Sequence, residues 1–169
     1  MTESTRSPAP APASTAAAEP EDARELSFTR VYAAPRERVW DAWTDPAQVV
    51  RWWGPRGFTT TTHQMDVRPG GTWLFIMHGP DGTDYDNRIV FTELVRPERL
   101  VYVHDGGEGS ADPPFHVTVT FADDGAGTRL DMRTVVASAA ERARLVEEFG
   151  AVEGALQHLE RLAEHLAEQ

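Results

Sequence analysis

The sequence has no cysteine, no lysine, and no apolar run near the ~20 residues that a membrane-spanning helix needs. The missing cysteines exclude disulfide scaffolds, thiol catalysis and Cys-ligated zinc sites. Its 16 basic residues are all arginines and face 27 acidic residues, which gives a formal net charge of −11. Binding to nucleic acid is disfavoured because the neutralisation of phosphates requires a basic surface. We therefore expect no nucleic-acid partner and no membrane span.

The N-terminal segment is poor in large apolar side chains. Residues 1–24 consist mostly of Ala, Pro, Ser, Thr and acidic residues. This composition predicts a disordered tail, because it cannot bury enough surface to offset the entropy lost on ordering. The segment also lacks the basic start and the apolar stretch of a secretory signal, so we expect a cytoplasmic protein. Residues 25–169 are expected to form one domain.

Hydrophobic patterns in this domain predict an α+β fold. An alternating strand over 26–32 is followed by two proline signals, Pro35 and Pro46, each of which is typical of the start of a short helix. Turn residues then separate six further predicted strands so closely that neighbouring strands must be antiparallel. These strands are expected at 59–67, 72–78, 84–95, 99–104, 115–121 and 128–136.

The C-terminal region predicts a long amphipathic helix. Residues 138–141 fit a capping box, and apolar residues recur in steps of four and three over 145–166. Gly150 and Gly154 each cost such a helix about 1 kcal/mol relative to Ala, so we expect a kink or a break near them. The strands over 115–136 have one apolar face, which is expected to receive this helix.

Six short motifs follow one another in a fixed order through the domain, at 30–46, 51–55, 65–71, 77–82, 92–102 and 127–130. Together they resemble the SRPBCC (START-like) superfamily, and within it the branch of heat-shock chaperone ATPase activator homologues. The resemblance implies the helix-grip fold, in which a curved antiparallel sheet of about seven strands wraps around a long C-terminal helix and leaves a cavity. It implies no shared catalytic residues.

One departure from the family concerns this cavity. The family usually has a Trp after a glycine in the last helix, whereas this chain has Ala155 after Gly154. Either neighbouring side chains fill the space or the cavity is larger in this chain. A void left unfilled would cost about 24 cal/mol per Å³, which a ligand could recover.

The hairpin between the strands at 99–104 and 115–121 indicates which side chains face the cavity. The simplest register sets His104 opposite Phe115 and Tyr102 opposite Val117, so that Tyr102 and His104 face inward and His116 faces outward. For the strand at 84–95 the pattern does not select a face. The residues expected to bind a ligand are Trp73, Phe75, Met77, Tyr102, His104, Phe115, Val117, Met132, Phe149, Ala155, Leu156 and Leu159.

No catalytic or metal site is expected. The sequence has no G-x-S-x-G motif, and His158 and His165 lie two helical turns apart, roughly 10 Å, too far to bind one ion. His104 is either a structural residue or a general acid or base. The four tryptophans at 40, 43, 52 and 53 either pack the short helices or line the cavity mouth. The acidic loop 105–112 is either a plain connection or a lid.

These observations favour the binding of a small hydrophobic molecule in an internal cavity, with no cofactor. Two alternatives stay open. One is a cyclase- or aromatase-like enzyme that acts on a polyketide-like substrate with the help of Tyr102 or His104. The other is a chaperone-cofactor-like protein-interaction module, which the branch name suggests.

Overall fold

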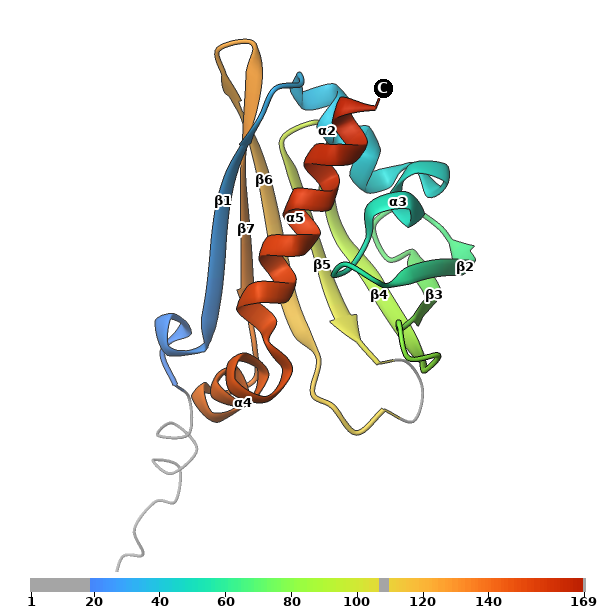
Figure 1. The fold of residues 1–169 in the computed structure, drawn as a ribbon. Coiled ribbons are helices and arrows are strands. Elements are labelled where there is room, and N and C mark those ends of the chain that lie inside the picture. Colours follow the sequence, from blue (N-terminus) through green and yellow to red (C-terminus); the bar gives the residue numbers. More distant parts are fainter. Residues whose placement is uncertain (1–18, 107–109, 169) are drawn as a thin grey trace, which may run out of the picture.

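A seven-stranded sheet forms the body of the protein in the computed structural model, which describes residues 19–106 and 110–168. All neighbouring strands are antiparallel, in the order β1-β7-β6-β5-β4-β3-β2 (Figure 1). The strands are β1 (Glu25–Tyr32), β2 (Thr59–Met65), β3 (Thr72–His78), β4 (Asp84–Val95), β5 (Arg99–Asp105), β6 (Phe115–Asp124) and β7 (Gly127–Val135). This confirms the predicted α+β fold and the number of strands.

Some strand ends differ from the prediction. β2 ends two residues early because the backbone turns immediately after it, where the Arg68 N–H donates to Asp66 O at 3.1 Å. β6 continues to Asp124, which pairs with Gly127 in β7. β5 includes Asp105, which forms an ion pair with Arg88 of β4 at 3.0 Å. The differences are confined to the turns, where a period-two pattern carries little information.

Two short helices connect β1 to β2, as predicted. They are α2 (Arg36–Thr44) and α3 (Pro46–Trp52). Pro35 is the N-cap of α2, one residue before the expected position, while Pro46 is the first residue of α3. The Asp45 carboxylate accepts a hydrogen bond from Ala47 N at 3.0 Å and so caps α3.

The N-terminal end of the described chain is held by the domain. A 3-10 helix η1 (Glu21–Arg24) falls within the segment predicted to be a tail. The Arg24 guanidinium donates to Val136 O at 3.1 Å, and Ala139 N donates to the Glu19 carboxylate at 3.0 Å. These hydrogen bonds attach residues 19–24 to the domain, although the sequence predicted them to be part of the tail. Residues 1–18 of the predicted tail lie outside the described residues.

The C-terminal helix is divided into α4 (Ala139–Phe149) and α5 (Ala151–Ala167). Ser138 Oγ accepts a hydrogen bond from Glu141 N at 3.0 Å and caps α4, as the capping-box pattern predicts. Gly150 has a φ of +59°, a left-handed conformation that favours glycine and ends α4. The predicted break is confirmed at Gly150, while Gly154 continues within α5.

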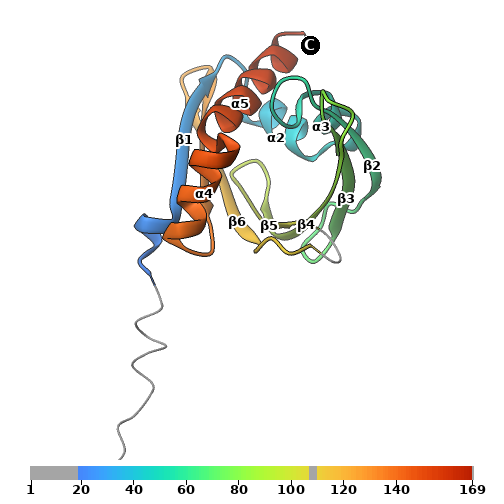
Figure 2. The same cartoon turned by 60° about the horizontal axis from the view of Figure 1, so that its bottom comes forward.

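The sheet is strongly curved, and α5 lies across its concave side (Figure 2). Hydrogen bonds fix α5 there: Tyr32 Oη donates to Leu159 O at 2.9 Å, and an Arg38 Nη donates to Leu166 O at 2.7 Å. The expected meeting of apolar faces in β6 and β7 is confirmed, because Val119 pairs with Met132. α5 therefore covers the apolar face of the sheet and closes one side of the space inside it.

Candidate functional site

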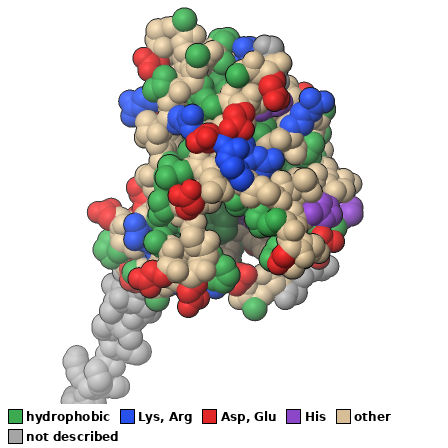
Figure 3. Space-filling view, viewed as in Figure 1, with side chains coloured by type: hydrophobic (Ala, Val, Ile, Leu, Met, Phe, Trp, Pro, Cys, Tyr) green, Lys and Arg blue, Asp and Glu red, His purple; other side chains and the backbone are tan. Residues whose placement is uncertain are grey.

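A pocket of about 260 Å³ lies between the concave face of the sheet and the two C-terminal helices. The segment 53–55, which follows α3, forms a further wall. In the space-filling view the surface is hollowed beneath the charged groups of α5, with hydrophobic side chains in its walls (Figure 3). The lining residues are Leu26, Phe28, Trp53, Gly54, Pro55, Met77, Tyr102, His104, Phe115, Val117, Met132, Thr134, Val136, Leu145, Ala151, Gly154, Ala155 and His158.

The structure brings seven of the twelve expected residues together around this pocket. They are Met77, Tyr102, His104, Phe115, Val117, Met132 and Ala155. The register that placed the hairpin residues is confirmed, because His104 pairs with Phe115 and Tyr102 pairs with Val117. Ala155 lines the pocket as well, so the missing family indole coincides with open space.

Three expected residues are buried outside the pocket lining. The rings of Trp73 and Phe75 are each 1% exposed and stack on one another with their centroids 3.9 Å apart. Leu159 is 2% exposed and belongs to the hydrophobic core under α5. These side chains support the pocket residues by packing and do not line the pocket.

The other two expected residues, Phe149 and Leu156, are 65% and 48% exposed and do not line the pocket. This corrects the expectation that one apolar face runs through the whole C-terminal helix. The left-handed Gly150 changes the direction of the chain, so that the faces of α4 and α5 are not continuous. Phe149 instead lies against the Arg144 guanidinium, 5.0 Å from the ring centroid.

Sequence reasoning missed several lining residues. Leu26 and Phe28 reach the pocket because β1 pairs with β7, where they face Thr134 and Met132. The alternation in β1 carries this signal only once its neighbour in the sheet is known. On α5, the spacing of four and three residues from Ala151 through Ala155 to His158 is helical, and it could have identified His158 as a lining residue.

Trp53 connects the pocket wall to the core. Its ring centroid lies 4.8 Å from that of Trp73 and 4.7 Å from that of His158, and the residue also lines the pocket. The other three tryptophans considered, Trp40, Trp43 and Trp52, are buried in the core. The packing interpretation therefore holds for all four, and Trp53 in addition forms part of the pocket wall.

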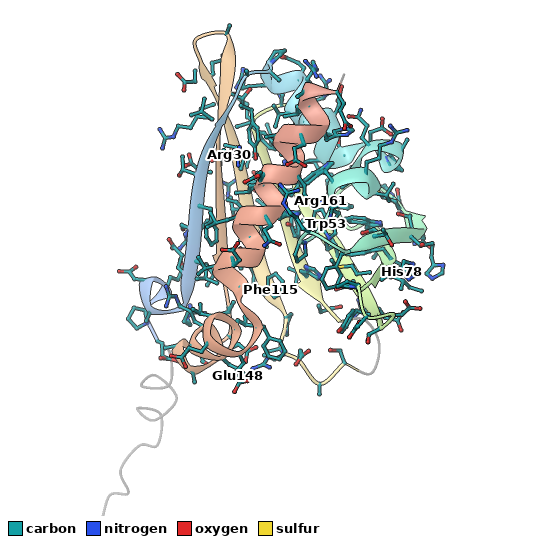
Figure 4. The ribbon with its side chains drawn as sticks, in the orientation of Figure 1. Arg30, Trp53, His78, Phe115, Glu148 and Arg161 are labelled. Carbon is teal, nitrogen blue, oxygen red and sulfur yellow. The ribbon has the colours of Figure 1, made fainter. Side chains whose placement is uncertain are left out.

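Gly54 sets the position of this wall. Its φ of +88° favours glycine, and a Cβ at this position would lie 2.5 Å from Met77 Cε. The Arg161 guanidinium donates to the carbonyl oxygens of Trp53, Gly54 and Pro55 at 2.9, 3.1 and 3.1 Å. The side chain of Arg161 lies next to Trp53 in Figure 4. The Arg161 guanidinium is thus hydrogen-bonded to the backbone of the segment 53–55.

His158 is a buried neutral imidazole. Its Nδ1 accepts a hydrogen bond from Gly54 N at 2.9 Å, so that the proton of the neutral ring is on Nε2. Burial lowers the pKa of His158 to about 3, and the nearby charge of Arg161 acts in the same direction. At neutral pH this side chain therefore presents an N–H donor and no charge.

His104 is also neutral, but its free nitrogen is an acceptor. Its Nε2 lies 2.8 Å from Asn87 Oδ1, while Asn87 Nδ2 donates to Tyr85 O at 3.0 Å and thereby fixes the amide orientation. His104 Nε2 is therefore the donor, and Nδ1 carries no proton. Burial lowers the pKa of His104 to about 4, against the opposing charge of Asp105.

Tyr102 supplies a hydroxyl group to the same wall. It is 4% exposed, and burial raises the pKa of its phenol. Tyr102 and His104 lie two residues apart on β5 and line the pocket from the same face of the sheet. The face of β4 that the sequence pattern left open is now defined, because Ile89 pairs with His104, Phe91 pairs with Tyr102, and both are buried.

Among the described residues, the lining contains no acidic residue and no arginine. Within the described ranges, no group of three or more His, Asp or Glu side chains is placed to hold a metal ion. Over the same ranges, no helix has the length and hydropathy that a membrane crossing requires. Part of the acidic loop considered as a lid, residues 107–109, lies outside the described residues.

One chain of polar side chains lies outside the pocket. His78 Nδ1 is 2.7 Å from Asp84 Oδ1, and His78 Nε2 is 2.8 Å from Thr61 Oγ1. The connectivity is that of an acid–base–nucleophile triad. However, His78 projects from the outer side of β3, away from Trp53 and Phe115 (Figure 4). His78 is therefore not among the described residues that line the pocket.

Comparison with solved structures places this architecture among bacterial proteins. The chain is 27% identical to a protein from Arthrobacter aurescens, with a TM-score of 0.82 over 90% of this chain and 91% of the other. It is 29% identical to a protein from Mycobacterium smegmatis, with a TM-score of 0.75 over 86% and 91%. The AHSA1 protein from Silicibacter pomeroyi shares the fold, at 22% identity and a TM-score of 0.69 over 85% and 97%.

No curated protein matches this chain. The profile of one family, described as Activator of Hsp90 ATPase homolog 1-like protein, matches residues 33–167. The matched region extends from the end of β1 to the end of α5 and includes most of the pocket walls. The chain therefore belongs to the family of Activator of Hsp90 ATPase homolog 1-like proteins, a branch of the SRPBCC superfamily.

Proposed function

We propose that this protein binds a small, mostly apolar molecule in the pocket between the sheet and the C-terminal helices. The observation that carries the proposal is an apolar space of about 260 Å³, around which the described part of the chain places no charged lining residue. Water in such a space finds few hydrogen-bond partners, and an empty space loses packing contacts. An apolar occupant avoids both costs.

The energetics require more than apolar contact. A ligand that buries ~200 Å² of apolar surface gains about 5 kcal/mol, while a micromolar complex needs about 8 kcal/mol. The polar side chains of the described lining, Tyr102, His104, Thr134 and His158, are the groups able to supply the difference. The proposed ligand site therefore consists of the apolar lining together with these four residues. Location in the cytoplasm stays a prediction.

Thermal unfolding with a graded set of apolar molecules tests the proposal. The set runs from benzene to naphthalene, and the protein is the full chain. A molecule present at 100 times its Kd stabilises the folded state by about 2.7 kcal/mol, which raises the Tm by roughly 5–10 °C in a chain of this size. If no molecule of the set raises the Tm, and native mass spectrometry detects no bound molecule, the proposal is wrong.

Catalysis of the cyclase or aromatase kind is a second candidate, since Tyr102 and His104 lie together on the pocket wall. Burial weakens both groups for proton transfer at neutral pH: it raises the pKa of Tyr102 and lowers that of His104 to about 4. Binding is therefore favoured over turnover. An enzyme would lose turnover and keep binding after the change His104→Ala. The chaperone-cofactor role that the family description suggests stays a prediction, tested by stimulation of a chaperone ATPase.

A further inference from the structure

Four polar side-chain atoms of the pocket lining have no hydrogen-bond partner within 19–106 and 110–168, the parts of the chain that the structure describes. They are the hydroxyls of Tyr102 and Thr134, Nδ1 of His104 and Nε2 of His158. The bonds that His104 and His158 do make determine the role of each free nitrogen. Nδ1 of His104 accepts only, Nε2 of His158 donates only, and each hydroxyl does either.

The chemistry of these atoms restricts what the pocket holds. One ligand hydroxyl is able to donate to His104 Nδ1 while it accepts from His158 Nε2–H or from Tyr102. A carboxylate has no proton to donate to His104, and the lining residues that the structure describes provide no cation to balance its charge. Arg161 does not serve as that cation, since its guanidinium already donates to three backbone carbonyls. An ammonium group lacks an acceptor for the proton of His158.

The volume sets the size of the ligand. A cavity of ~150 Å³ holds benzene, which has six heavy atoms. At the same density, the pocket of about 260 Å³ holds roughly ten heavy atoms. Aromatic walls on two sides, Trp53 and Phe115, suit a flat body of this size.

We infer that the ligand is a neutral bicyclic or similarly compact apolar molecule with one hydroxyl group, which is recognised by Tyr102, His104 and His158. The inference rests on the proposed function and specifies its ligand class. The apolar body of the ligand packs against the apolar lining. Its hydroxyl donates to Nδ1 of His104 and accepts from Nε2 of His158 and from the phenol of Tyr102. Charged molecules of the same size are rejected.

Isothermal titration calorimetry at pH 7 with four matched probes tests this. The probes are naphthalene, 2-naphthol, 2-methoxynaphthalene, which accepts but does not donate a hydrogen bond, and the anion 2-naphthoate. We expect 2-naphthol to bind at least about fivefold more tightly than naphthalene and 2-methoxynaphthalene, because one net hydrogen bond raises the affinity by about that factor. We expect 2-naphthoate to bind at least about a hundredfold more weakly than 2-naphthol.

Two tyrosine variants provide the residue-level test. Tyr102→Phe should weaken 2-naphthol by about fivefold and leave naphthalene unchanged, which also shows that the variant is folded. The matched control is Tyr85→Phe, since Tyr85 is 47% exposed and does not line the pocket. This control should bind all four probes like the parent protein.

The outcomes separate the two proposals. If naphthalene binds as tightly as 2-naphthol, or 2-naphthoate binds as well as either, the inference about the hydroxyl group is overturned while the proposed function stands. If none of the four probes binds, the proposed function fails and this inference fails with it. The expected order of affinities, together with its loss in Tyr102→Phe alone, supports the inference.

Discussion

The substitution Ala155→Trp restores the residue that the family usually has, and it tests whether the pocket is the ligand site. Ala155 lines the pocket of about 260 Å³. An indole has nine heavy atoms, while the six of benzene fill ~150 Å³, so the indole leaves less than about 110 Å³ of the pocket. The remaining space is too small even for benzene. We expect the affinity for 2-naphthol to fall at least about fiftyfold.

The same substitution should not unfold the protein. Filling ~150 Å³ of unoccupied space stabilises the folded state by up to about 3.6 kcal/mol, while overpacking costs about 1–3 kcal/mol. We therefore expect the free energy of unfolding, measured in urea, to be equal to that of the parent or higher. The opposite changes in affinity and stability distinguish a filled pocket from a damaged fold.

The neighbouring residue offers a matched control. Leu156 is 48% exposed and does not line the pocket, so Leu156→Trp places the same indole on the surface of the same helix. This variant should bind 2-naphthol like the parent protein in the calorimeter. Full affinity in Ala155→Trp, with its stability unchanged, would refute the assignment of this space to the ligand.

Further predictions concern acid stability, the pocket wall and α4. Burial lowers the pKa of His104 and His158 below the value near 6.5 of the unfolded chain, so acidification favours unfolding from about pH 6.5 downward. Between pH 7 and pH 5 each of these two histidines should lower the free energy of unfolding by about 2 kcal/mol, and His104→Gln should remove its share of this loss. Gly54→Ala should destabilise by about 1–3 kcal/mol in urea, because of its left-handed φ and the contact with Met77. Phe149→Ser should change stability by less than about 0.5 kcal/mol, since Phe149 is 65% exposed, and a larger loss would show that it is buried in solution.

The sheet was largely predictable because period-two alternation and short turns are local signals. The pairing of Tyr102 with Val117 follows from the shortest hairpin register alone. The alternation in β6 and β7 likewise indicated the apolar face that α5 covers. A pattern of this kind assigns a strand face, but it does not say which other strand lies next to it.

The site was only partly predictable, because its decisive features join distant parts of the chain. Gly54 N donates a hydrogen bond to His158 Nδ1 across 104 residues of sequence, and no local sequence pattern near either residue predicts that contact. One apolar face was extended across Gly150 although a kink or break was expected near it, and this predicted that Phe149 and Leu156 face the pocket, whereas both are exposed. One left-handed glycine is enough to change the phase of an amphipathic pattern.

His104 and His158, the two histidines of the described pocket lining, allow stability and ligand affinity to be separated by pH. In the folded protein the pKa of His104 is about 4 and that of His158 is about 3, so at pH 5 fewer than about one in ten of either imidazole is protonated. The acceptor of His104 and the donor of His158 therefore remain as they are at pH 7, and the affinity for 2-naphthol should change by less than about 1.3-fold. The unfolded chain does take up protons over this range, and the stability falls. Calorimetry at pH 7 and pH 5 should show constant affinity beside falling stability, whereas a parallel loss of both would mean that these histidines are charged in the folded pocket.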